Sequence, residues 1–311
     1  MELSQPVVFE PLFMERVWGG HRLADELGKP LPPGAVIGES WEIVDREDAQ
    51  SVVTSGEFAG KTLHQLWRNH RREIFGDVPD APRFPLLAKV LDARETLSVQ
   101  VHPPAHLAEE LDGEPKTEMW YVLGATPEAT LYAGFRRGVT RKSFEHALVS
   151  GHAADLLHPL PVHEGDAIFI PSGRCHAIGG GCLMVEMQQN SDTTYRVFDW
   201  NRVGLDGQPR QLHISESLRS IDFDDHEPTL QVADGERIVA CDYFCVDRWD
   251  LSSPRTEATV GCAIFTVLAG EVACQGMTFR RGDFFLLPAA AKDRILSPVS
   301  STAQVLRTTI P

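Results

Sequence analysis

The stretch EGDAIFIPSGRCHAI, residues 164–178, decides the fold of this 311-residue chain. Its Gly-Asp pair makes a turn into a strand, and the four apolar residues AIFI that follow have the composition of a buried strand. The PSG tripeptide is a tight turn that ends this strand. His176 then lies on a returning strand. Its side chain is therefore predicted to face the interior, where a metal ion could sit.

Upstream of this turn, two further stretches place polar side chains inside apolar sequence. LSVQVHP carries Gln100 and His102, which share one face of a strand, and EMWYV begins with Glu118. Two histidines, a carboxylate and an oxygen donor suit zinc in an open catalytic site, whereas a closed structural site would use cysteine. A single buried histidine is more often an ordinary core residue, so the combination carries the prediction. Gln100 is a poor zinc donor and could instead orient a water or hydroxyl.

Short alternating or β-branched runs, bounded by Gly, Pro and Asp, recur along the whole chain. This pattern predicts a mainly β protein of sandwich or barrel type. Helices are expected at residues 62–75, 105–111 and 141–157, as insertions that decorate the β core. The acidic segment DDHEP, residues 224–228, predicts a domain boundary, with a catalytic domain at 1–227 and a second domain at 228–311.

The C-terminal segment repeats the skeleton of the first motif. Gly282 and Asp283 precede four apolar residues and Pro288, and Asp293 stands where His176 stood. Residues 228–311 contain no histidine. We therefore expect the same strand–turn–strand frame there, in a domain that binds no metal.

These segments resemble known families. Residues 164–178 are similar to the second motif of the cupin superfamily. The stretches RVWGG (16–20), QVHP (100–103), KTEMWYVLGA (116–125) and SDTTYRVFDWNR (191–202) resemble the type I mannose-6-phosphate isomerases in their short bacterial form. This resemblance implies two cupin-type jelly-roll barrels, with helical insertions in the N-terminal catalytic one and a metal-free cupin at the C-terminus.

The resemblance also implies a reaction and its residues. It implies the interconversion of mannose 6-phosphate and fructose 6-phosphate through a cis-enediol, with one Zn²⁺ per chain. The zinc ligands would be His102, Glu118 and His176, with Gln100 as a possible fourth, and Arg196 would be catalytic. From the residues alone, Arg196 would more simply form a salt bridge with Asp192 or Asp199.

Two lysines and a tryptophan are candidates for the substrate pocket. Lys89 lies in an apolar run and Lys116 lies two residues before Glu118, so both are expected to contact the substrate phosphate, and Lys116 to take part in catalysis. The alternatives are an edge-strand lysine for Lys89 and a solvent lysine for Lys116. Trp18 would form one wall of the sugar site or be a core aromatic. The proton-transfer base stays open among Lys116, Glu118, a zinc-bound hydroxide and another histidine; the remaining histidines, among them His213, are expected to be incidental.

The amino-acid composition limits the kinds of binding partner and the compartment that we expect. A formal net charge of −15 argues against nucleic acid. No stretch approaches the roughly 20 apolar residues that span a bilayer, and the N-terminus lacks a signal peptide's pattern. The six cysteines form no CxxC pair and suggest a reduced, cytoplasmic protein. We expect a monomer or homodimer whose partner is a small sugar phosphate.

Other functions fit the same residues. One is a cupin that binds a sugar without turning it over, as a sensor or regulatory module. Another is an isomerase for a related sugar phosphate. A third is a metal-dependent oxygenase, since two histidines and a carboxylate also hold iron.

Overall fold

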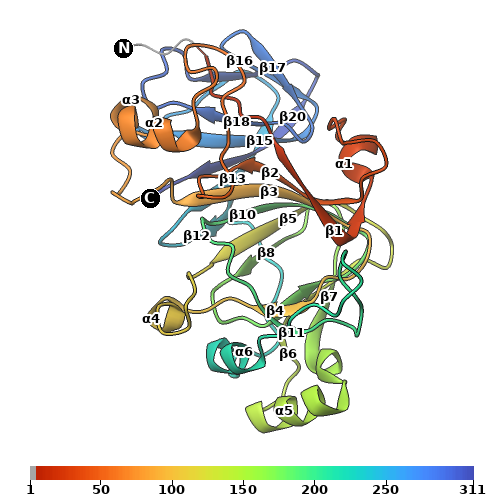
Figure 1. Ribbon diagram of the computed structural model, residues 1–311. Coiled ribbons are helices and arrows are strands. Elements are labelled where there is room, and N and C mark those ends of the chain that lie inside the picture. The colour runs from red at the N-terminus through yellow and green to blue at the C-terminus, as the bar shows by residue number, and fades with distance from the viewer. Residues whose placement is uncertain (1–4) are drawn as a thin grey trace. The chain divides into compact units, whose positions relative to one another are not determined.

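The computed structural model describes residues 5–311 and divides the chain into two compact units (Figure 1). Unit 2 consists of residues 13–40 and 89–231. Unit 1 contains the described residues through Leu12, together with 41–88 and 232–311. Residues 41–88 thus group with the C-terminal segment, whereas a division into 1–227 and 228–311 assigns them to the catalytic domain. That division stays a prediction about independently folding domains.

Unit 2 contains most of a six-stranded sheet in which non-consecutive strands lie side by side. Its strand order is β1 (Leu12–Gly20), β2 (Ile37–Ile43), β3 (Leu86–Ala93), β10 (Cys182–Gln189), β5 (Glu118–Ala125) and β8 (Ala167–Ile170). Every residue of β3 is buried, as expected of a central strand. The strand predicted from AIFI is β8, and it pairs antiparallel with β5.

The second sheet of unit 2 has five strands. Their order is β11 (Tyr195–Phe198), β4 (Val99–Val101), β9 (His176–Ile178), β6 (Thr130–Phe135) and β7 (Leu157–Pro161). One apolar core joins side chains of the two sheets, with Trp120 and Met184 from the first and Leu131 and Ile178 from the second. The functional side chains described below therefore stand on strands that a buried core holds in place.

The other face of the five-stranded sheet is covered by helices. They are α5 (Arg141–Ser150), the 3₁₀ helix η1 (Ala153–Leu156) and α6 (Ile214–Ser220). Two further helices are α1 (Arg22–Asp25), which follows β1, and α4 (Ala105–Ala108), which follows β4. Thr140 caps α5 through Ser143, and Gly151, with a φ of 76°, ends it in the left-handed conformation. Phe144 of α5 packs with Phe135 of β6 in the cluster beneath. The helices predicted at 105–111 and 141–157 thus exist, although both are shorter.

Unit 1 also contains two sheets around one core. The first has the order β12 (Arg237–Ala240), β13 (Cys245–Leu251), β20 (Ala303–Thr309), β15 (Ala263–Ala269) and β18 (Phe284–Leu287). The second has the order β14 (Arg255–Thr256), β19 (Ile295–Pro298), β16 (Glu271–Cys274) and β17 (Met277–Arg280). Phe265, Phe279 and Phe285 stack in the core between them. The strand predicted after Gly282 and Asp283 is β18.

The helical prediction for residues 62–75 needs two corrections. The segment forms two short helices, α2 (Leu63–Asn69) and α3 (Arg71–Ile74), because the chain leaves helical geometry at His70. Both belong to unit 1, so they do not decorate the unit that carries the site. The fold class is confirmed as mainly β, with separate packed sheets in each unit. Among the described residues, no helix is long and apolar enough to cross a membrane.

Arg307 on β20 joins two buried carboxylates of unit 1. Its Nη2 lies 2.8 Å from Glu257 Oε1 and its Nη1 lies 2.6 Å from Asp247 Oδ2. Burial opposes the ionisation of Glu257, but the hydrogen bonds and charge of Arg307 outweigh it and lower the pKa of this carboxyl. Because the folded-state pKa is depressed, Glu257 contributes stability above its unfolded pKa, and this contribution is lost as the pH falls through the folded value.

Replacing Glu257 with Gln is therefore expected to lower the free energy of unfolding at pH 7 by roughly 2 kcal/mol, the value of hydrogen bonds to a charged group. The difference from the wild type should shrink once the pH falls below about 4.5. Urea unfolding at several pH values measures it. Glu271→Gln, which removes an exposed ion pair with Arg280, is the control. A pH-independent difference would contradict this account.

Candidate metal and substrate site

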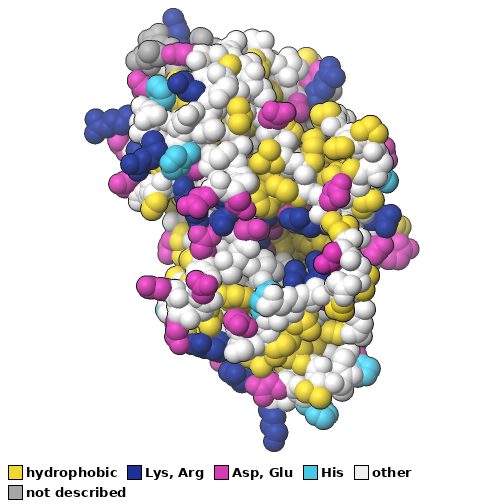
Figure 2. Space-filling model, viewed as in Figure 1, with side chains coloured by type: hydrophobic (Ala, Val, Ile, Leu, Met, Phe, Trp, Pro, Cys, Tyr) yellow, Lys and Arg dark blue, Asp and Glu magenta, His cyan; other side chains and the backbone are white. Residues whose placement is uncertain are grey.

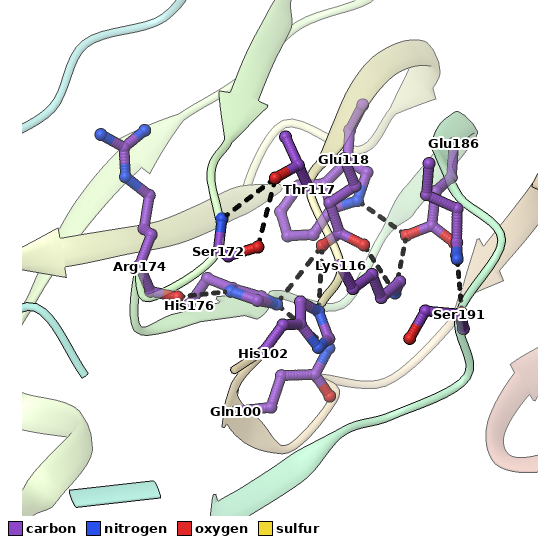
Figure 3. A network of polar contacts seen from close by, with 12 residues as sticks. Gln100, His102, Lys116, Thr117, Glu118, Ser172, Arg174, His176, Glu186 and Ser191 are labelled. Carbon is purple, nitrogen blue, oxygen red and sulfur yellow. Dashed lines mark hydrogen bonds and ion pairs between the residues drawn. The ribbon is translucent and has the colours of Figure 1, made fainter. Parts of the chain in front are cut away.

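Three fully buried side chains meet at the ends of three strands of unit 2 (Figure 3). His102 follows β4 directly, Glu118 begins β5 and His176 begins β9. Glu118 Oε1 lies 3.5 Å from His102 Nε2 and 3.4 Å from His176 Nε2. One ligand atom of each residue lies within 4.8 Å of the others. The structure therefore brings together the three residues that were predicted to hold a metal.

Both imidazole rings are fixed in the orientation that a metal ligand needs. His102 Nδ1 lies 2.8 Å from the carbonyl oxygen of Thr193, and His176 Nδ1 lies 2.9 Å from that of Arg174. A ring that donates its Nδ1–H to a carbonyl keeps the lone pair on Nε2. His102 Nε2 and Glu118 Oε1 are buried without a hydrogen-bond partner in the described part of the chain. A cation would satisfy both atoms.

The protonation states also favour a cation. Burial lowers the pKa of His176 to about 3, with help from the neighbouring His102. Burial and the charge of Lys116 lower the pKa of His102. Burial opposes ionisation of Glu118, but Lys116 and His102 outweigh it and hold its pKa well below the usual value. Neutral imidazoles and an ionised carboxylate are the ligand forms of these groups.

Gln100 lies beside this cluster. It pairs with His176 across β4 and β9, and its Nε2 lies 3.2 Å from His176 Nε2. A half-turn of the amide would place Oε1 at the same point. Gln100 can thus offer either a donor to the ring or an oxygen to a cation.

Lys116 and Lys89 are both buried and both bound to carboxylates. Lys116 Nζ lies 2.6 Å from Glu118 Oε2 and 3.8 Å from Glu186 Oε1. Lys89 Nζ lies 3.3 Å from Glu186 Oε2 and 3.7 Å from Glu39 Oε2. Lys89 stands on β3, between β2 and β10, so the edge-strand alternative is wrong. The solvent alternative for Lys116 is also wrong, since the residue is 5% exposed.

Sequence reasoning missed Glu186, the carboxylate that both lysines share. It stands opposite Trp120 in the pairing of β10 with β5 and accepts a hydrogen bond of 2.9 Å from Trp120 Nε1. Burial raises its pKa against the opposing charges of Lys116 and Lys89. Burial likewise opposes the charge of Lys116, but Glu118 and Glu186 outweigh it and raise the pKa of this lysine. A lone glutamate within the apolar run CLMVEM was the available signal.

Arg196 stands on β11 opposite Gln100 of β4. Within the described residues, Arg196 forms no salt bridge with Asp192 or Asp199, which was the simpler alternative. Its Nη1 instead donates a hydrogen bond of 2.9 Å to the carbonyl oxygen of Gln211. Burial and the charges of Arg210 and Arg202 lower its pKa, opposed by Asp199. His213, which was expected to be incidental, lines the same cavity as Arg196, and its Nδ1 accepts a hydrogen bond of 3.2 Å from Arg196 N.

A cavity of about 560 Å³ in unit 2 is lined by several of these groups, but not by the three candidate metal ligands themselves. Figure 2 shows a hollow on the displayed face, with Lys and Arg side chains at its floor and rim. Trp18 is 3% exposed, belongs to the core beneath and also lines the cavity. The core alternative is therefore confirmed, and the role of Trp18 as a wall of the sugar site stays a prediction. The other residues named above that line it are Glu39, Lys89, Gln100, Lys116, Glu186, Asp192, Arg196, Arg210 and His213.

Sequence comparison places the chain among known proteins. A family model for the catalytic domain of type I phosphomannose isomerase matches residues 8–129. Mannose-6-phosphate isomerase ManA of Bacillus subtilis is 36% identical, over 92% of this chain and 93% of that protein. The chain belongs to the type I mannose-6-phosphate isomerase family. Mannose-6-phosphate isomerase of Streptococcus mutans is similar too, at 37% identity over 93% of this chain and 94% of that protein.

Solved structures of this isomerase family share the fold. The crystal structure of mannose 6-phosphate isomerase from Bacillus subtilis superposes with a TM-score of 0.87 and 32% identity, over 98% of this chain and 99% of the other. The apo form of mannose 6-phosphate isomerase from Salmonella typhimurium is 17% identical and has the same fold, with a TM-score of 0.75 over 98% and 99% of the two chains. The resemblance inferred from the sequence motifs is thereby confirmed.

Proposed function

We propose that this chain interconverts mannose 6-phosphate and fructose 6-phosphate through a cis-enediol, with one Zn²⁺ held by His102, Glu118 and His176. The observation that carries the proposal is the buried cluster of these three ligands, in which His102 Nε2 and Glu118 Oε1 have no hydrogen-bond partner among residues 5–311. Gln100 and Lys116, which contact His176 and Glu118, line the polar cavity beside it. Membership of the isomerase family supports the same reaction. Gln100 is the candidate for a fourth ligand.

The donor set fits zinc in an open site, because three protein ligands leave room for substrate or water. When bound, such an ion acts as a Lewis acid on the substrate oxygens. The same two histidines and carboxylate would also accept iron, which is the basis of the oxygenase alternative. Metal analysis of the purified protein decides between the two metals.

The chain's own residues position the sugar and stabilise charge. Lys116 is held protonated by Glu118 and Glu186, so at neutral pH it donates a proton or a hydrogen bond more readily than it accepts one. We assign it a catalytic role beside the reacting carbons. Arg196 carries a guanidinium that stays charged at any working pH and can stabilise an enediolate without reorganisation. Lys89, with Lys116, would contact the substrate phosphate, and Trp18 would form one wall of the sugar site.

The direct test is a steady-state assay with mannose 6-phosphate, coupled to detection of fructose 6-phosphate. Turnover that requires bound metal supports the proposal. A protein that binds mannose 6-phosphate in calorimetry but forms no ketose would instead be the sugar-binding or regulatory cupin. Turnover of another aldose phosphate at a higher kcat/KM would indicate the related isomerase.

The Lys and Arg side chains that line the cavity predict a strong preference for a phosphorylated sugar. Mannose 6-phosphate should have a kcat/KM at least about 100-fold above that of free mannose, since each charge-assisted contact is worth about 1.5–3 kcal/mol. Lys89→Met should narrow this preference, because it removes one cation from the cavity wall. The exposed Lys142, changed to Met, is the control. Equal activity on unphosphorylated mannose would refute the placement.

A further inference from the structure

The segment between β11 and α6 forms one wall of the cavity. Gly204, Leu205, Asp206 and Arg210 of this segment line the cavity. Gly204 N donates 2.7 Å to the carbonyl of Gln208, which closes the segment into a loop. We call residues 199–213 the wall segment. None of its contacts was foreseen from the sequence.

One buried carboxylate joins the two ends of the wall segment. Asp199 is 5% exposed. Its Oδ2 accepts a hydrogen bond of 2.7 Å from Arg210 Nε, and its Oδ1 accepts one of 2.5 Å from Arg210 Nη2. Arg202 Nε donates 3.0 Å to the same Oδ1, while its Nη1 donates 2.6 Å to the carbonyl of Thr96. Asp199 thus compensates two guanidinium groups at once.

A third guanidinium, that of Arg196, lies in the field of this cluster without sharing its carboxylate. Arg210 and Arg202 both act on Arg196 electrostatically. Arg196 is held by the wall segment through the Gln211 carbonyl, and its buried Nε has no hydrogen-bond partner within residues 5–311. Three guanidinium groups therefore lie around one carboxylate. Arg196 and Arg210 line the cavity, whereas Arg202 does not, and Arg210 is bound to Asp199. Arg196 is therefore the cation of this cluster that is left to take an anionic ligand.

We propose that Asp199 is a positioning residue, which holds Arg202 and Arg210 and thereby leaves Arg196 as the guanidinium that meets the anionic substrate. The proposal rests on the proposed function, since it assumes a phosphorylated substrate. The physical reason is competition. A guanidinium binds phosphate in a bidentate manner, so an arginine released from Asp199 would hold the substrate anion away from its productive position.

The test compares Asp199→Asn with variants that restore the charge balance. Asp199→Asn should release Arg210 into the cavity, so the dissociation constant of inorganic phosphate should fall about fivefold or more while kcat falls at least about tenfold. Metal content should stay at the wild-type level. Asp199→Glu keeps the carboxylate and should bind phosphate within about twofold of the wild type. The double variant Asp199→Asn with Arg210→Met removes the released cation and should restore the wild-type phosphate affinity.

Phosphate affinity measured by calorimetry separates this proposal from a structural role. If Asp199→Asn lost turnover but bound phosphate equally or more weakly, Asp199 would be only a structural anchor and the proposal would be wrong. If Asp199→Asn did not fold, the phosphate affinities of Arg210→Met and Arg196→Met would test the proposal instead. Phosphate affinity should change less than about twofold in the first and fall more than about tenfold in the second. Equal losses would overturn the proposal. Absence of isomerase activity in the wild type would count against the proposed function alone.

Discussion

Replacing His176 with alanine is expected to abolish bound metal and turnover together. The ring is fully buried, its Nδ1 is bound to the Arg174 carbonyl, and its Nε2 lies 3.4 Å from Glu118 Oε1. Mutating a residue that only hydrogen-bonds to a metal ligand typically lowers metal affinity or activity by about 10–100-fold. Loss of the ligand itself should therefore lower kcat/KM by more than about 100-fold. Elemental analysis of the purified variant, with a parallel coupled assay, measures both quantities.

The matched control for this variant is His146→Ala, which removes an exposed histidine from α5 of the same unit. It should keep the wild-type metal content and activity. His102→Ala and Glu118→Ala should behave as His176→Ala does. Stoichiometric zinc in the His176→Ala protein would show that His176 is not a metal ligand. Metal retained with loss of activity would instead leave the ring a role in substrate binding.

Replacing Arg196 should remove catalysis and leave the metal in place. Arg196→Lys keeps the charge but loses the planar fork, one arm of which donates to the Gln211 carbonyl. Removing one preorganised donor from a site of developing negative charge typically costs about 100–1,000-fold in kcat. We expect a loss of this size for Arg196→Lys and at least as much for Arg196→Ala, with zinc still stoichiometric.

Two measurements make this second prediction specific. Arg137→Ala removes an arginine whose side chain is 86% exposed and should change kcat/KM less than about twofold, as surface charges do. A loss below about tenfold in Arg196→Ala, which is about 1.4 kcal/mol of transition-state stabilisation, would contradict the catalytic role. Loss of metal in Arg196→Ala would also contradict it.

Local sequence was sufficient where the determining interactions are local. The strand–turn–strand pattern of residues 164–178 predicted β8, the turn and the start of β9, because a short apolar run, glycine and proline act within a few residues. The three metal-site residues were predicted for a related reason: each is a polar group in a run that must be buried, and such a group needs a partner.

The charge pairing of the cavity could not be predicted in this way. Lys89, Glu186 and Glu39 come from three different strands, β3, β10 and β2, which become neighbours only through the order of the sheet. Whether Lys89 lay on an edge or a central strand was likewise a matter of strand order. Coulomb interactions depend on distance in space, and sequence patterns report distance along the chain.

The amino-acid sequence by itself determined the class of fold, the positions of the main strands of the site and the identity of the residues that can hold a metal. The tertiary structure alone decided which cation pairs with which carboxylate. Arg196 was predicted either to pair with Asp192 or Asp199 or to serve the substrate. In the structure Arg202 and Arg210 bind Asp199 instead. Periodicity specifies which face of a strand is buried, whereas the allocation of a single carboxylate among three arginines depends on where a loop returns in space.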